Sequence, residues 1–240
     1  LAGRVMSATP SAARVREAYR HCLGLARRHY ENFPVASFAV PARLRGPIAA
    51  VYAFARTADD FADEEDRSPA TRLALLRDYA RRLDAMAAGD PGDDPVFIAL
   101  ADSRRRFGLP LPLFHDLLDA FGQDVTKKRY ADFAEVLEYC RRSANPVGRL
   151  LLYLYDEATP DRLTRSDAVC TALQLINFLQ DIAQDYREHG RIYFPLDDMR
   201  ACGVDEGAIA TGRTDAAMLR LTQLQVGRIR ALLATGAPLG

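Results

Sequence analysis

The spacing of apolar residues constrains the fold of this chain more than any other feature. Apolar side chains recur every three or four positions along most of the 240 residues, and strict alternation with polar residues never exceeds about four positions. That period is typical of amphipathic helices, whereas half-buried strands need alternation. No internal repeat, low-complexity tract or long linker interrupts the pattern. It predicts an all-α fold, with residues 1–240 in a single domain.

Local signals set the expected helix boundaries. Ser68 followed by Pro69 predicts an N-cap and a first helical residue, and Gly190 predicts a helix end. One expected helix begins at residue 69 and ends at a loop over residues 89–95. The other expected helices cover residues 41–65, 96–107, 112–127, 133–142, 146–155, 164–190 and 215–233. Because the sequence starts with Leu rather than Met and stops at Pro-Leu-Gly, we expect natural residues to be missing at one or both ends.

Charge and cysteine content exclude several classes of protein. The 32 basic and 32 acidic residues balance, so the basic excess that drives phosphate-backbone binding is absent and no nucleic-acid partner is expected. The four cysteines show no C-x-x-C spacing, which indicates neither a zinc site nor a disulfide framework. The uncharged run 168–180 is too short to cross a bilayer. We therefore expect a cytoplasmic protein, with at most peripheral contact at the inner face of the membrane.

The first chemically informative segment covers residues 52–65. At about 100° per residue, Tyr52, Arg56, Asp59 and Asp63 fall within an arc of about 60°. Like charges one turn apart are locally unfavourable, and acids at a helix C-terminus oppose the macrodipole. One interpretation is a solvated face on which Arg56 relieves the repulsion; the other is a functional strip.

A second segment repeats the carboxylate pair. Asn177, Asp181 and Asp185 would share an arc of about 80° on one continuous helix, and Arg191 and Tyr193 follow. Carboxylate and amide oxygens suit a hard cation, and Mg²⁺ is usually held by one or two carboxylates together with waters and substrate phosphates. Two such strips facing one cavity would bind a diphosphate through Mg²⁺.

Departure of a diphosphate with its bonding electrons would leave a carbocation. Arginine is suited to bidentate contacts with the phosphate oxygens, and aromatic faces attract cations. The arginine candidates are Arg56 and Arg191. The aromatic candidates are Tyr52, Phe54, Tyr139, Phe178 and Phe194. For each aromatic residue, packing in the core is the alternative.

Residues 27–195 resemble the squalene/phytoene synthase family of isoprenoid synthases. The resemblance rests on the aspartate-rich segments 51–63 and 177–195, and on Tyr139-Cys140 followed by Val147-Gly148. It implies a helical bundle with a central cavity, an isoprenoid diphosphate substrate and Mg²⁺. In the segment 139–148 the residues between these two pairs differ from the usual family pattern.

That difference, together with the segment 31–37, resembles the bacterial hydroxysqualene synthase branch of hopanoid biosynthesis. The resemblance implies that presqualene diphosphate loses diphosphate, rearranges and captures water to give hydroxysqualene, which is carbon–oxygen lyase chemistry. No nicotinamide is expected. Other enzymes of the hopanoid pathway are candidate partners.

The resemblance also implies roles for individual residues. The expected metal ligands are Asp59, Asp63, Asp181 and Asp185, with Asp60 as a weaker candidate. Together with Tyr139 these four are the expected catalytic residues. The expected substrate-binding residues are Phe33, Tyr52, Arg56, Asn177, Gln180, Arg191 and Tyr193.

Alternatives remain at this point. Within the same family, the chain could instead condense prenyl diphosphates head to head to presqualene diphosphate, squalene or phytoene. A non-enzymatic assembly or scaffold relative is a second alternative. Asn145 is interpreted either as the cap of the helix begun by Pro146 or as a residue that holds a water molecule near the cation.

Overall fold

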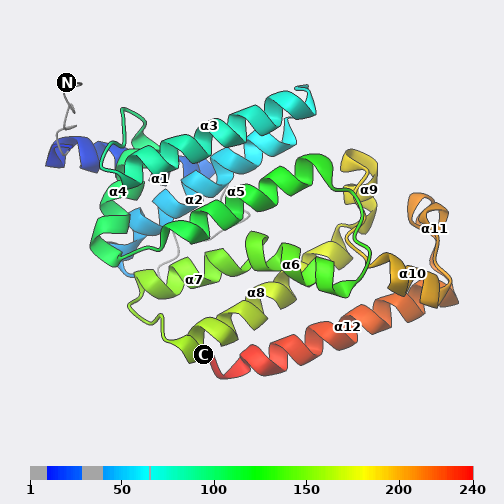
Figure 1. Ribbon diagram of the computed structural model, residues 1–240. Coiled ribbons are helices and arrows are strands. Elements are labelled where there is room, and N and C mark those ends of the chain that lie inside the picture. Colours follow the sequence, from blue (N-terminus) through cyan, green and yellow to red (C-terminus); the bar gives the residue numbers. More distant parts are fainter. Residues whose placement is uncertain (1–9, 29–39, 65, 240) are drawn as a thin grey trace. The chain divides into compact units, whose positions relative to one another are not determined.

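The computed structural model describes residues 10–28, 40–64 and 66–239, and every regular element within them is a helix (Figure 1). The prediction of an all-α fold is therefore confirmed. The helices are α1 (Ala12–Arg28), α2 (Ala42–Asp63), α3 (Pro69–Ala87), α4 (Pro95–Phe107), α5 (Leu111–Thr126), α6 (Phe133–Ser143), α7 (Asn145–Leu154), α8 (Pro160–Gln180), α9 (Ile182–His189), α10 (Leu196–Cys202), α11 (Glu206–Ala210), α12 (Ala216–Gly236) and a short 3-10 helix (Ala237–Leu239). None of these described helices is both long and apolar enough to span a membrane.

The chain divides into two compact units, whose boundaries fall within α5 and α7. One unit covers Leu1–Gly122 and Leu150–Glu157, and the other covers Gln123–Arg149 and Ala158–Gly240. The single-domain organisation of residues 1–240 stays a prediction, as does the central cavity.

An aromatic cluster forms the core of the first unit. The ring of Phe54 on α2 stacks on Tyr79 of α3 at 5.0 Å between centroids. It also meets Phe97 of α4 and Phe114 of α5 edge to face, at 6.1 and 5.3 Å. Such pairs contribute roughly 0.5–1.5 kcal/mol beyond the area they bury. Phe54 is fully buried in this cluster. Its role is therefore core packing and not the lining of a cavity for the cation.

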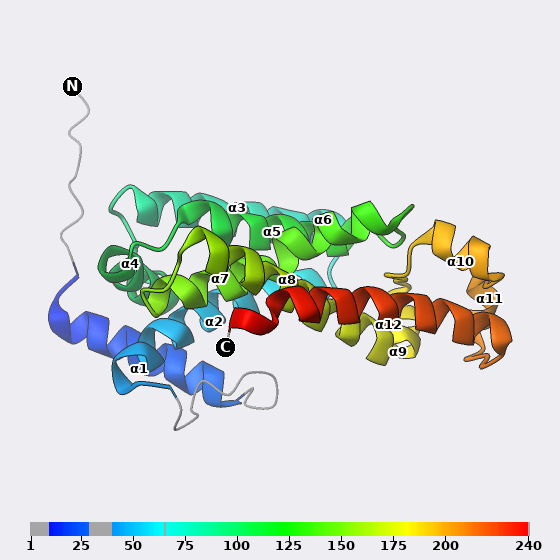
Figure 2. The ribbon, with the colours of Figure 1, turned by 90° about the horizontal axis from the view of Figure 1, so that it is seen from below.

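Helix packing organises the second unit, in which α12 runs along α8 (Figure 1 and Figure 2). A bond between two buried side chains joins α7 to α8: Thr171 donates its hydroxyl to Oδ1 of Asn145 at 2.9 Å. Asn145 is itself the first residue of α7, and its side chain ties two helices together. Phe194 packs in an apolar cluster with Ile192 and Met199 and also lines a small cavity beside Phe178, so both of its interpretations hold in part.

Most predicted boundaries agree with the structure to within about three residues, but the helix predicted over 164–190 is wrong. It consists of two helices, α8 and α9, separated at Asp181, whose backbone leaves the helical region at φ −101° and ψ 8°. Its start also lies earlier, because the Thr159 side chain accepts from the backbone N–H of Arg162 and Pro160 occupies the first turn. The prediction missed α1, α10 and α11, the last two of which are short.

Candidate active site

The first acidic segment lies at the C-terminal end of α2, as predicted. Nη2 of Arg56 lies 2.6 Å from Oδ1 of Asp60, and Nη1 lies 3.4 Å from Oδ2 of Asp59. Asp59 is half-buried, whereas Asp63, the last residue of the helix, is exposed. Arg56 therefore offsets the carboxylate repulsion, as the local interpretation expected. The arrangement still leaves a cation and three carboxylates on adjoining faces of one helix.

Tyr52 lies one turn before this group and is half-buried. Burial raises the pKa of its hydroxyl, and the charge of Arg56 partly offsets that effect. The hydroxyl therefore stays protonated at neutral pH.

The second acidic segment follows the break between α8 and α9. Asn177 and Asp181 are exposed, whereas Asp185 on α9 is half-buried. Burial, followed by the charge of Asp181, raises the pKa of Asp185 to about 6. Arg191 opposes that shift. Gly190 turns the chain back in the left-handed conformation, and the backbone N–H of Arg191 donates to the carbonyl oxygen of Asp185 at 3.0 Å.

A buried carboxylate gathers two of the predicted site tyrosines. Tyr139 of α6 donates its hydroxyl to Oδ2 of Asp124 at 2.7 Å, and Tyr193 donates to Oδ1 at 3.0 Å. Asp124 is only 7% exposed. Burial, reinforced by the charge of Asp124, raises the pKa of both hydroxyls well above the ordinary value, so both remain protonated donors. Sequence reasoning missed Asp124 because it belongs to neither acidic segment.

Aromatic rings extend this group. Phe178 of α8 stacks on Tyr193 at 3.9 Å between centroids and 5° between planes, and Tyr139 lies 5.4 Å from Tyr193. Asp185 and Arg191 line a small cavity together with Phe178, Tyr193 and Phe194. The second unit thus brings together six residues that were singled out from sequence.

Gln180 is exposed at the end of α8. Phe33 lies outside the described residues.

The donor set fits Mg²⁺. Each unit presents a pair of carboxylates, and burial together with the charge of Asp181 raises the pKa of Asp185, an effect that a bound cation would oppose. In the described part of the chain no three His, Cys, Asp or Glu side chains form a protein-only metal site. A cation held by two carboxylates and completed by water and phosphate oxygens needs no such cluster.

Comparisons relate the chain to known proteins. The family profile described as Squalene/phytoene synthase matches residues 26–240. The hydroxysqualene synthase of Rhodopseudomonas palustris is 41% identical over 209 residues, which cover 87% of this chain and 70% of the relative. That of Zymomonas mobilis is 42% identical over 190 residues, which cover 78% of this chain but only 62% of the relative. This chain thus spans less than two thirds of the Zymomonas protein.

A solved structure is similar over nearly the whole chain. The crystal structure of squalene synthase HpnC from Alicyclobacillus acidocaldarius matches with a TM-score of 0.88 at 37% identity, covering 95% of this chain and 85% of that one.

Proposed function

This chain belongs to the squalene/phytoene synthase family, whose members act on isoprenoid diphosphates, and on that premise we propose that it converts presqualene diphosphate to hydroxysqualene. The observation that carries the proposal is the sequence identity of 41% and 42% to two hydroxysqualene synthases. The carboxylate pairs and the buried aromatic group of this chain supply groups suited to such a reaction.

The proposed reaction is a substitution with rearrangement and no redox step. The carbon–oxygen bond to diphosphate breaks, and the electron pair leaves with the diphosphate. A ring bond of the resulting cyclopropylcarbinyl cation shifts to give an allylic cation. The oxygen of one water molecule then bonds to that cation and a proton is released.

The chain's charged residues are proposed to manage the leaving group. Asp59 and Asp63 in one unit, and Asp181 and Asp185 in the other, would hold Mg²⁺. Bound Mg²⁺ would neutralise the charge that develops on the departing diphosphate. Arg191 is 7% exposed and has the planar geometry for two parallel bonds to phosphate oxygens, and we assign Arg56 the same role.

The aromatic group is proposed to stabilise the cation. The faces of Tyr139, Tyr193 and Phe178 carry negative potential, and Asp124 adds a buried negative charge behind two of them. Because the hydroxyls of both tyrosines are held by Asp124, their rings have fixed positions. We assign Phe33, Tyr52, Asn177 and Gln180 to substrate contacts.

Two observations favour a second candidate, head-to-head condensation of prenyl diphosphates. The similar solved structure is that of a squalene synthase, and a phytoene synthase of Mycobacterium tuberculosis is 33% identical over 214 residues, 87% of this chain and 69% of the relative. A scaffold protein without activity is the third candidate.

Product analysis distinguishes the three candidate functions. Purified protein with Mg²⁺ is incubated with presqualene diphosphate or with farnesyl diphosphate, with and without NADPH, and the extracted lipids are identified by mass spectrometry. We expect hydroxysqualene from presqualene diphosphate, no consumption of NADPH and no product in excess EDTA. Condensation products from farnesyl diphosphate would support the second candidate, and no product from either substrate would support the third.

A matched pair of variants tests the assigned residues. Asp185→Asn should lower kcat by on the order of 100-fold, since the carboxylate acts on the leaving group. Asp66→Asn makes the same change at an exposed carboxylate outside the two pairs and should leave kcat unchanged. Equal activity of the two variants would remove Asp185 from the mechanism.

A further inference from the structure

Helices α1 and α4 of the first unit concentrate positive charge in a chain whose net charge is zero. α1 carries five arginines against the single acid Glu17, a net charge of +4 with His21 neutral. α4 carries three arginines in its last turn against the single acid Asp102. The two helices pack against each other, so these charges share one region of the unit.

Helix electrostatics explains only part of this excess. Arginines in the last turns of α1 and α4 interact favourably with the helix dipoles. Arg14, Arg16 and Arg20 lie outside the last turn of α1, so the dipole does not stabilise them, and the first turn holds no acid to compensate Arg14. Among the described residues Arg14 pairs with Asp93, which accounts for one of the three.

The remaining arginines of α1 form a strip. Arg16, Arg20 and Arg27 fall within an arc of about 40° at helical spacing, and all three are exposed. Within residues 10–28, 40–64 and 66–239 none of the three has an ion-pair partner. Arg16 and Arg20 are one turn apart, so their like charges repel, and an anionic ligand would offset that repulsion.

A cavity of about 660 Å³ adjoins the N-terminal end of this strip, where Arg16 lies. Arg16 and Tyr19 of α1 line one side, and Arg104 and Arg106 of α4 line another. Val15, Met86 and Ile98 are among the apolar residues of its wall. The combination of guanidinium groups and apolar walls suits an amphiphile with an anionic head.

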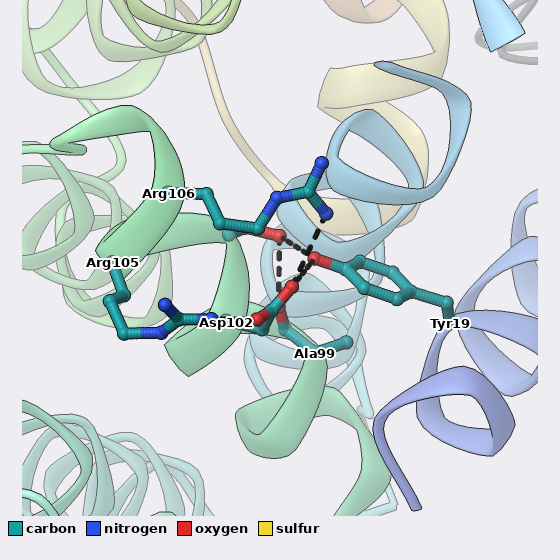
Figure 3. A network of polar contacts seen from close by, with 6 residues as sticks. Tyr19, Ala99, Asp102, Arg105 and Arg106 are labelled. Atoms are coloured by element: carbon teal, nitrogen blue, oxygen red, sulfur yellow. Dashed lines mark hydrogen bonds and ion pairs between the residues drawn. The ribbon is translucent and has the colours of Figure 1, made fainter. Parts of the chain in front are cut away.

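A polar network joins the two basic helices, as Figure 3 shows. Tyr19 donates its hydroxyl to Oδ2 of Asp102 at 2.8 Å, and Arg105 donates to Oδ1 at 2.6 Å. Arg106 contacts Oδ2 at 3.3 Å. The carboxylate of Asp102 therefore holds two guanidinium groups of α4 beside α1. Hydrogen bonds thus fix the position of part of the basic surface.

We propose that the basic face, defined as Arg16, Arg20 and Arg27 of α1 with Arg104–Arg106 of α4, docks on an anionic phospholipid bilayer. Lipid phosphates would contact the arginines, and the cavity would admit a headgroup with its glycerol. Each basic residue near an anionic membrane surface changes affinity by roughly fivefold, so a cluster of this size is sufficient for reversible attachment. The proposal does not depend on the reaction assigned above.

Sedimentation of the full chain with lipid vesicles tests whether the basic face binds anionic bilayers. The probes are phosphatidylcholine vesicles with and without about a third phosphatidylglycerol, at low and high salt. We expect binding to the anionic vesicles alone, weakened by salt. The triple variant Arg16→Glu, Arg20→Glu, Arg27→Glu should bind at least about 100-fold more weakly.

A matched control separates the basic face from overall charge. The triple variant Arg77→Glu, Arg200→Glu, Arg230→Glu makes the same charge change at exposed arginines on α3, α10 and α12. It should keep anionic-vesicle binding within a few-fold of the unchanged protein. Circular dichroism should show equal helix content for both variants.

Three results would overturn the proposal: no binding of the unchanged protein to anionic vesicles, equal binding to neutral vesicles, or equal weakening by the two triple variants. Hydroxysqualene formation in detergent should be unaffected by either triple variant. A failure of vesicle binding is therefore distinguishable from a failure of the proposed reaction.

Discussion

Single carboxylates organise the polar interior of both units. Asp124 accepts hydrogen bonds from Tyr139 and Tyr193 in one unit. Asp102, whose side chain is 13% exposed, accepts from Tyr19 in the other. Each carboxylate joins segments that are distant in the sequence, so removing its charge affects the placement of several groups at once.

Replacing Asp124 tests its positioning role at the aromatic group. In Asp124→Asn one tyrosine keeps an acceptor oxygen while the other faces an N–H group, which should destabilise the fold by about 1–3 kcal/mol. We also expect kcat to fall by roughly tenfold or more with little change in KM, because a misplaced ring affects the cation rather than substrate binding. A lower melting temperature with unchanged kcat would limit Asp124 to a structural role.

The pKa of Asp102 predicts how acid affects stability. Burial raises this pKa, but hydrogen bonds from Tyr19, Arg105 and Arg106 outweigh burial and lower it from its ordinary value of 3.8. A carboxyl whose pKa is lower in the folded state stabilises the fold above its unfolded pKa and loses that contribution as pH falls through the folded pKa. The unfolding free energies of the unchanged protein and Asp102→Asn should therefore differ by a constant amount above about pH 5 and converge below about pH 4. A constant difference down to about pH 3 would contradict the lowered pKa.

At the scale of elements, close helix contacts decide which positions tolerate a side chain. α12 contains two glycines in contrasting environments. A Cβ at Gly236 would lie 3.1 Å from the backbone oxygen of Arg165 and would also collide with Val169 of α8. A Cβ at Gly227 would meet nothing within 4 Å. The same substitution at these two positions therefore separates helix propensity from helix packing.

The two alanine variants should change stability in opposite directions. Gly227→Ala should stabilise the protein by roughly 0.5–1 kcal/mol through helix propensity. Gly236→Ala should destabilise it by about 1–3 kcal/mol, because backbone atoms of α8 cannot rotate away from the new methyl group. Urea unfolding of both variants measures the difference, and a stabilising Gly236→Ala would show that α12 does not pack on α8 this closely.

At the scale of the whole molecule, the proposed reaction requires both carboxylate pairs to act on one diphosphate. Each pair belongs to a different unit, so coupling between them is a property of the assembled chain. Double-mutant analysis measures such coupling directly.

Asp59→Asn and Asp185→Asn should be strongly non-additive. If each lowers kcat by about 100-fold and both act on the same leaving group, the double variant should lose much less than the roughly 10,000-fold expected for independent sites. Mg²⁺ with inorganic diphosphate should also raise the melting temperature of the unchanged protein but of neither single variant. Fully multiplicative losses, or an undiminished thermal shift in either variant, would show that the pairs act separately.

The sequence alone determined the features that depend on local geometry. Helical periodicity, caps such as Ser68 and the strip on α2 follow from a fixed rotation per residue, so spacing predicts them. The tertiary structure decided what depends on packing between distant segments. It separated α8 from α9 at Asp181 and placed Phe54 in the core. It also brought Tyr193 to Asp124 across 69 residues of sequence, a contact that no local spacing encodes because it exists only after the helices have packed.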